Sequence, residues 1–223
     1  MLTASTATAG DAVPRDTSFT AWSTYLKVRK NHPEVVLAPA KLPDGVKAYE
    51  NVVYSTLKAT PYGDRDLHVD IFRPDDGKTY PALIMIHGGG WNSGDKSLQV
   101  PMAQMIAAKG YVTIPVEYRL IPEAVYPAGF NDIKAAVRWV RKNAAQYGID
   151  PDRIAVSGCS AGAQLATLTG VTNGLDTHKG DGRLSDVSAD VQAIVSMDGI
   201  ATFVSDNNIA DARQRLETKG KMP

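Results

Sequence analysis

The chain has 223 residues, a length that suits one α/β domain with a sizeable hydrophobic core. Lysine plus arginine and aspartate plus glutamate each total 24, so no net charge favours nucleic acid or an anionic membrane as a partner. The single cysteine, Cys159, excludes an internal disulfide framework, and no segment reaches the roughly 18 consecutive apolar residues of a membrane-spanning helix.

Small and polar residues fill positions 1–16, which therefore predict a flexible N-terminus. This segment lacks the apolar core of an intact signal peptide, so a mature secreted or periplasmic protein and a cytoplasmic protein are both compatible with it. Thr17 and Ser18 offer an N-cap for a helix that we expect to run to about Asn31, before Pro33 ends it.

Two further segments predict an antiparallel hairpin. Residues 51–57 are rich in β-branched side chains, and residues 67–71 alternate between apolar and polar side chains. Such alternation indicates a strand with one exposed face. His68 and Asp70 fall on the polar face, where we interpret them as a surface pair and not as catalytic groups.

A continuously apolar segment follows at residues 82–86, and mostly apolar segments follow at residues 111–116, 154–157 and 191–197. Runs of this kind are typical of strands that are buried on both faces of a sheet. In the intervening segments, the apolar residues have the spacing of a helix face. Strands that alternate with helices predict an α/β fold, with a mostly parallel sheet that is covered by helices on both faces and preceded by the hairpin.

The strongest helix follows Pro127, and we expect Gly148 to end it. Its apolar stripe has the spacing of one helix face and consists of Phe130, Ile133, Val137, Val140, Ala144 and Tyr147. An earlier helix with apolar positions around Met102 should end at Gly110.

Polar motifs follow directly after three of the buried strands. His-Gly-Gly-Gly occupies residues 87–90, Glu-Tyr-Arg occupies residues 117–119, and Ser160 follows the strand at 154–157. In parallel sheets the carboxyl ends of the strands meet at one edge, where binding and catalytic groups collect. We therefore expect the three motifs to lie close together.

The segment Gly158-Cys159-Ser160-Ala161-Gly162 has the pattern G-x-S-x-G between a predicted strand and a predicted helix. In that context the pattern is typical of a nucleophile elbow, a sharp turn that holds the serine hydroxyl out over the sheet. A glycine-rich connector without catalytic function fits the same five residues. Cys159 is a weaker candidate nucleophile, because its side chain would point away from that of Ser160.

The pairing of His-Gly-Gly-Gly with the later G-x-S-x-G resembles the α/β-hydrolase esterase and lipase family. More narrowly, residues 48–200 are similar to the hormone-sensitive-lipase-like carboxylesterases and to bacterial carbohydrate esterases related to feruloyl and acetylxylan esterases. The resemblance implies an α/β-hydrolase fold. It also implies a serine carboxylester hydrolase acting on esters with short acyl groups or on carbohydrate-linked esters.

The family's site residues can be placed by position. Ser160 would be the nucleophile. The backbone N–H groups of Gly88, Gly89 and Ala161 would form the oxyanion hole, where a Cβ on either glycine would block the ester. His87 resembles a residue that positions this loop and not a general base. Four more residues resemble the family's structural network: Tyr118, Arg119, Glu123 and Asp132.

The chain departs from the family in its acid and base. The family order is serine, then aspartate or glutamate, then histidine, with the last two on loops after the seventh and eighth strands. Residues 191–197 form only the sixth predicted strand, and His178 is the one histidine after Ser160. We therefore interpret residues 17–223 as a single incomplete domain that lacks both groups, with Asp198 and His178 as weaker candidates.

Two other functions fit the same residues. An arylformamidase-like amide hydrolase shares both glycine motifs, and a non-catalytic α/β-hydrolase module would need no base. No metal cluster or phosphate-binding loop is visible, so the sequence implies no cofactor. The expected partner is a small-molecule or polysaccharide-linked ester, with neither nucleic acid nor membrane insertion involved.

Overall fold

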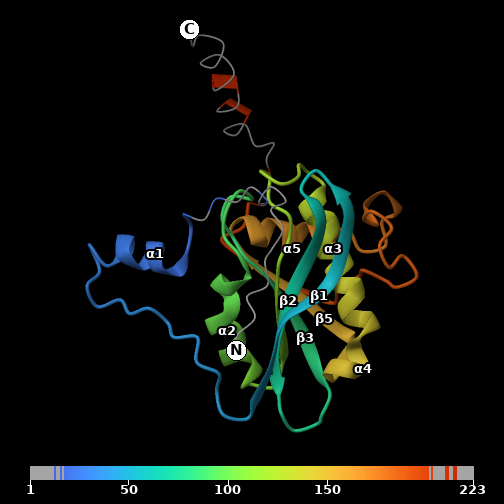
Figure 1. Cartoon of the computed structure of the whole chain (residues 1–223), viewed down its shortest axis with the longest axis horizontal. Helices are drawn as coiled ribbons and strands as arrows, with labels where there is room; N and C mark the ends of the chain where they lie inside the picture. Colours follow the sequence, from blue (N-terminus) through green and yellow to red (C-terminus); the bar gives the residue numbers. More distant parts are fainter. Residues whose placement is uncertain are drawn as a thin grey trace, which may run out of the picture.

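A computed structural model describes residues 13, 16, 18–200, 202, 209–210 and 213–214. Its centre is a six-stranded sheet with the order β1-β2-β4-β3-β5-β6 (Figure 1). The strands are β1 (Val46–Thr60), β2 (Gly63–Pro74), β3 (Tyr80–Ile86), β4 (Val112–Val116), β5 (Ile149–Cys159) and β6 (Ala193–Met197). β1, β2 and β4 pair antiparallel, whereas β4, β3, β5 and β6 run parallel, as the alternating pattern predicts.

Helices cover both faces of the sheet. The helices that pack on it are α2 (Val100–Ala107), α3 (Ala128–Lys142), α4 (Ala144–Tyr147) and α5 (Ala161–Val171), whereas α1 (Ala21–Val28) lies to one side (Figure 1). Two short 3₁₀ turns are η1 (Lys96–Gln99) and η2 (Asp176–His178). Successive residues of β3 face opposite layers. Met85 packs with Ala103 and Ala107 of α2, while Ile84 and Ile86 pack in the larger core with α3 and α5.

Residues 67–71 lie in the antiparallel strand β2 as predicted, but the prediction that one face of this strand is exposed is wrong. Leu67, Val69 and Ile71 have no exposed surface, and Asp70 on the other face is only 5% exposed. Asp70 and His68 do not form a pair either. Lys96 of η1 lies 2.7 Å from the Asp70 carboxylate, and His68 lies 3.0 Å from Glu117. The segment η1–α2 covers the face that alternation alone assigns to solvent.

Two helix boundaries also differ from the sequence prediction. The N-cap of α1 is Thr20, whose hydroxyl accepts a hydrogen bond from the Ser23 N–H, and not residues 17–18. The helix predicted after Pro127 is interrupted at Asn143, whose side chain donates to the Trp139 carbonyl at 2.8 Å. Its apolar stripe is nevertheless buried as predicted, and Gly148 ends α4 in the left-handed conformation with φ 62°.

The apolar run at residues 191–197 predicts a strand that is buried on both faces, but β6 lies at the edge of the sheet. Ile194 is 37% exposed and Val195 is 47% exposed, because β5 is the only strand that pairs with β6 among the described residues. Residues 1–16, which the sequence predicts to be flexible, and residues 203–223 fall largely outside the described residues. No helix in the described part of the chain is long and apolar enough to cross a bilayer.

Candidate active site

The turn between β5 and α5 has the geometry that G-x-S-x-G predicts. Ser160 sits at the N-cap of α5 with φ 53° and ψ −119°, a conformation that L-residues rarely adopt. The backbone closes so tightly that a Cβ on Gly158 would lie 2.2 Å from the carbonyl carbon of Gly162. A side chain at Gly158 would therefore force the turn open.

The elbow is fixed against the strands on both sides. A Cβ on Gly162 would lie 2.2 Å from the carbonyl oxygen of Ile86, so α5 begins in direct contact with the end of β3. On the other side, the Ser160 N–H donates to the Met197 carbonyl at the end of β6, at 2.9 Å. The serine backbone is thus held between two parallel strands.

The glycine loop after β3 lies against the elbow. A Cβ on Gly88 would lie 2.7 Å from the Cys159 carbonyl oxygen and 3.3 Å from the Ser160 Cβ. Gly89 has φ 127°, and a Cβ there would lie 2.1 Å from the Ser93 carbonyl oxygen. The sequence predicts that a Cβ here would obstruct the ester. The structure adds a different reason, which is that the loop backbone itself leaves no room for a Cβ.

His87 is buried beneath this loop. Its Nδ1 lies 2.8 Å from the Gly88 carbonyl oxygen, and its ring stacks on Tyr118 with 4.5 Å between the centroids. The Tyr118 hydroxyl donates to the His87 carbonyl at 3.0 Å, and burial raises the pKa of Tyr118, which keeps the hydroxyl protonated. These contacts suit a residue that positions the loop.

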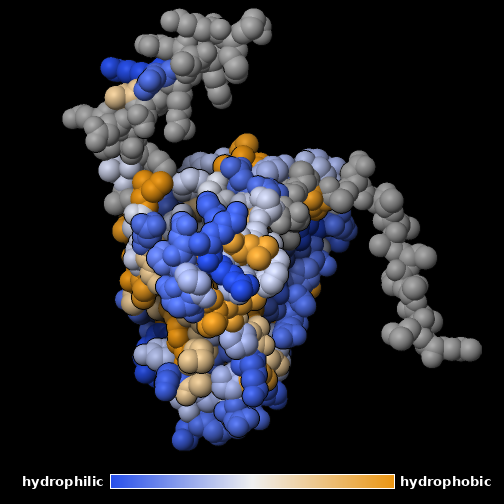
Figure 2. Space-filling model, turned by 90° about the vertical axis from the view of Figure 1, so that its left-hand side faces the viewer, coloured by the Kyte–Doolittle hydropathy of each residue, from blue (hydrophilic) through white to orange (hydrophobic). Residues whose placement is uncertain are grey.

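Ser160 opens into a cavity of about 610 Å³ that Cys159 and the glycine loop also line. The opposite wall comes from α1 and the segments on either side of it, through apolar side chains that include Phe19, Tyr25, Val28, Val36 and Leu37. In Figure 1, α1 lies to one side of the sheet, and Figure 2 shows hydrophobic residues between hydrophilic ones on that side. No pattern in the sequence predicts that this N-terminal segment contributes to the site.

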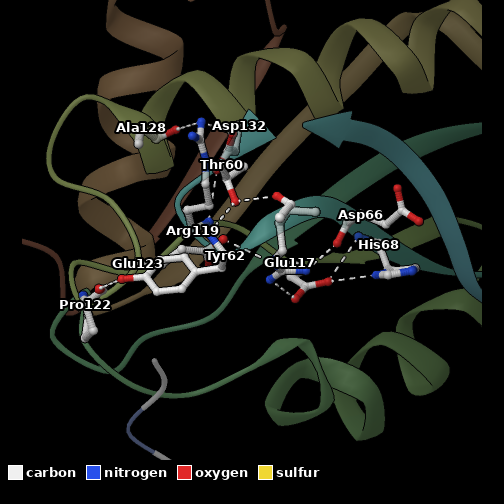
Figure 3. A network of polar contacts seen from close by, with 12 residues as sticks. Thr60, Tyr62, Asp66, His68, Glu117, Arg119, Pro122, Glu123, Ala128 and Asp132 are labelled. Atoms are coloured by element: carbon white, nitrogen blue, oxygen red, sulfur yellow. Dashed lines mark hydrogen bonds and ion pairs between the residues drawn. The ribbon is translucent and has the colours of Figure 1, made fainter. Parts of the chain in front are cut away.

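Buried ion pairs brace the backbone behind the site (Figure 3). Asp132 of α3 is fully buried, and one of its carboxylate oxygens lies 2.7 Å from Arg119 and 2.6 Å from Arg183. Burial lowers the pKa of Arg183. The ion pairs with Asp181 and Asp132 outweigh this effect and raise the pKa above its ordinary value. Arg119 and Asp132 were predicted as scaffold. The sequence does not predict the role of Arg183, because nothing around an arginine in a polar loop indicates that it pairs with a distant buried carboxylate.

A second network holds the segment that follows β4. Arg65 of β2 lies 2.7 Å from Glu117 and 3.0 Å from Glu123, and His68 approaches the other oxygen of Glu117 (Figure 3). The Tyr54 hydroxyl donates to the Glu117 carbonyl at 2.7 Å. Glu123 therefore contacts scaffold and not the Ser160 cavity.

The two candidate acid and base residues lie in different places. Asp198 is exposed and follows Met197, so it lies at the carboxyl end of β6 next to the elbow. His178 lines a separate cavity with Lys134 and Arg138, and its Nδ1 lies 2.8 Å from the Thr177 hydroxyl. The structure does not bring His178 to Ser160. Within the described ranges, no cluster of three or more histidine, cysteine, aspartate or glutamate side chains could hold a metal ion.

Residues 69–221 match the BD-FAE family. The chain is 35% identical over 139 residues to Esterase LipC of Mycobacterium tuberculosis, a match that covers 60% of this chain and 34% of that protein. It is 45% identical over 89 residues to Carboxylesterase NlhH of the same species, which covers 40% of this chain and 28% of that one. The chain thus spans about a third of the length of the curated relatives it matches.

The similar solved structures are also esterases. A truncated form of a carbohydrate esterase from gut microbiota is 31% identical with a TM-score of 0.59, over 69% of this chain and 56% of that one. The esterase Est2 of the Planctomycetes species Thermogutta terrifontis, with propionate bound, is 28% identical with a TM-score of 0.61. That match covers 78% of this chain and 62% of Est2.

Proposed function

Because the chain belongs to the BD-FAE family and shares the α/β-hydrolase fold of its esterase relatives, we propose that it carries the nucleophile and oxyanion hole of a serine carboxylester hydrolase. The observation that supports this most is the conformation of Ser160. A non-glycine residue with such angles costs about 1–3 kcal/mol, and strain of this kind persists mainly where function requires it.

In the proposed reaction an ester binds in the cavity beside Ser160. The Ser160 hydroxyl oxygen attacks the ester carbonyl carbon, the bond to the alcohol oxygen breaks, and an acyl-serine forms that water then hydrolyses. The backbone N–H groups of Gly88, Gly89 and Ala161 would stabilise the negative charge on the carbonyl oxygen during both steps. Because Ala161 is the first residue of α5, the dipole of that helix adds to the stabilisation.

The attack requires a base to take the proton from the Ser160 hydroxyl. His178 is poorly placed for this role, because it lines another cavity. Asp198 lies at the correct edge of the sheet and is better placed for the acid that orients a base than for the base itself.

We propose esters with short acyl groups or carbohydrate-linked esters as substrates. The propionate in the similar esterase structure supports the first class, and the similar carbohydrate esterase supports the second. The cavity wall formed by α1 and residues 35–38 is apolar, which suits the uncharged part of such an ester.

Labelling with a fluorophosphonate tests the nucleophile directly. We expect the probe to attach at Ser160 and the label to disappear in Ser160→Ala. The matched variant Cys159→Ala alters the neighbouring residue of the same turn and should keep the label. Loss of the label in Cys159→Ala, or its retention in Ser160→Ala, would refute the assignment.

Any hydrolysis of p-nitrophenyl acetate or of N-formylkynurenine should likewise depend on Ser160. The ratio of the two hydrolysis rates separates an esterase from an amide hydrolase.

A further inference from the structure

A cavity of about 380 Å³ lies between α3 and the loop that joins α5 to β6. In Figure 1 this loop lies beside α3, on the opposite side of the view from α1. Neither Ser160 nor the glycine loop at residues 88–90 lines the cavity, and charged and hydroxyl side chains form much of its wall. It therefore has no part in the proposed ester cleavage.

Two cationic side chains of α3 are buried at this cavity. Lys134 is 2% exposed and Arg138 is 5% exposed. They are four positions apart, so they lie on the same face of the helix. Neither side chain forms an ion pair with a carboxylate in the part of the chain that the structure describes. Buried charges in proteins are normally paired, so these two cations call for a counterion.

Backbone carbonyls satisfy part of the hydrogen-bonding capacity of the two cations but not their charge. The Lys134 Nζ donates to the Thr169 carbonyl near the end of α5, at 3.0 Å. The Arg138 guanidinium donates to the carbonyls of Val187 at 2.9 Å and Arg183 at 3.3 Å. A carbonyl dipole carries no net charge, and burial lowers the pKa of both Lys134 and Arg138. An anion in the cavity would stabilise both charges.

The acidic side chains of the wall do not cancel this charge. Asp186 and Asp190 line the cavity, but Asp186 pairs at 3.3 Å with Lys142, which lies outside the wall. Lys179 adds a third cation to the wall, so three cations stand against two carboxylates even while His178 is neutral. The cavity therefore has an excess of positive charge.

We propose that this cavity binds the phosphate group of a small molecule. The phosphate oxygens pair with the Lys134 ammonium and the Arg138 guanidinium, and the wall offers the hydroxyl groups of Ser185 and Ser188 as further donors. The loop backbone comes close to the cations at Gly180, where a Cβ would lie 3.3 Å from the Arg138 Nη1. A volume of about 380 Å³ falls in the range that holds small organic ligands, so the site has room for the rest of the molecule.

Calorimetric titration of the 223-residue chain with inorganic phosphate at constant ionic strength tests the site without requiring catalysis. Lys134→Met keeps a side chain of similar length and should weaken phosphate binding about tenfold or more, because a hydrogen bond to a charged group is lost. Lys109→Met removes an exposed lysine outside the cavity and should leave the binding unchanged. Acetate should bind more weakly than phosphate, because it has fewer oxygens and less negative charge.

Ser185→Asp serves where Lys134→Met does not fold, because Ser185 is an exposed residue of the wall. The new carboxylate should repel phosphate and abolish its binding, whereas Ser185→Asn has the same size without the charge and should bind phosphate as wild type does. Ser160→Ala should also leave phosphate binding unchanged, so the result is independent of the proposed function. The proposal is overturned if wild type does not bind phosphate, if acetate binds as tightly, or if Lys134→Met and Ser185→Asp bind phosphate as wild type does, which would indicate an adventitious ion only.

Discussion

Tyr118 holds His87 at two points: its hydroxyl donates to the His87 carbonyl at 3.0 Å, and its ring stacks on the imidazole with 4.5 Å between centroids. Both residues are buried. The contact ties the segment after β4 to the start of the glycine loop after β3. It therefore couples the position of that loop to the scaffold of buried ion pairs around Arg119.

Tyr118→Phe should lower the free energy of unfolding by about 1–3 kcal/mol, because it keeps the stacked ring and leaves the buried His87 carbonyl without this donor. Denaturant unfolding measures the change. Tyr111→Phe is the control, because Tyr111 is 43% exposed. Equal stability of wild type and Tyr118→Phe would show that the hydrogen bond contributes nothing net.

Gly89→Ala should slow fluorophosphonate labelling of Ser160 by about 100-fold or more, since the loop must shift and with it the oxyanion donor that we propose there. The reason is the clash of the new Cβ with the Ser93 carbonyl at 2.1 Å. Gly77→Ala is the matched control. Gly77 also has a positive φ, of 74°, but a Cβ there meets nothing within 4 Å. A normal labelling rate in Gly89→Ala would place the oxyanion donors elsewhere.

The sequence predicted what depends on local pattern. The apolar runs became β3, β4 and β5, the stripe after Pro127 is buried, and the five-residue glycine pattern became the turn at Ser160. These features follow from periodicity and from backbone angles that only a few residue types accept. The parallel order of the central strands followed from their alternation with helices.

Apart from the two helix boundaries, the features that escaped prediction depend on distant contacts. The burial of Asp70 results from Lys96, which lies on a different element. Arg183 reaches Asp132 from a polar loop. The N-terminal segment contributes a wall to the Ser160 cavity only because the chain brings it back to the carboxyl edge of the sheet. None of these has a periodic signature.

Asp132→Ala should lower the free energy of unfolding by about 3–5 kcal/mol, because it leaves the partly buried guanidinium groups of Arg119 and Arg183 without their shared, fully buried carboxylate. Asp186→Ala is the control. Asp186 pairs with Lys142 at 3.3 Å, but both side chains are largely exposed, so its loss should cost about 0–1 kcal/mol. Similar small effects for the two variants would show that the buried pairs are not needed for stability.

Lys134 should make stability depend on pH in the alkaline range. Burial lowers the pKa of Lys134 in the folded chain below its ordinary value of 10.5. Between the lowered pKa and 10.5, the unfolded chain binds more protons at this group, so its contribution to stability rises with pH.

Lys134→Met removes this titration and keeps a side chain of similar length. The difference in unfolding free energy between the variant and wild type should therefore shift in favour of wild type as the pH rises towards 10.5. The Thr169 carbonyl, which accepts from Lys134 at 3.0 Å, also accepts from the Thr172 hydroxyl at 3.2 Å. A difference that does not change with pH would contradict the lowered pKa.

His178 should have no part in activating Ser160 in the 223-residue chain. It lines a different cavity, its Nδ1 lies against Thr177, and its ring approaches the Phe130 ring edge-on at 6.2 Å. A histidine base would give the labelling rate of Ser160 an inflection near pH 6.5, the ordinary histidine pKa. Without such a base the serine hydroxyl stays protonated and attacks slowly. We therefore expect slow labelling without that inflection, and the same rate and pH profile in His178→Ala. Fast labelling that His178→Ala abolishes would make His178 the base and require the loop around η2 to rearrange.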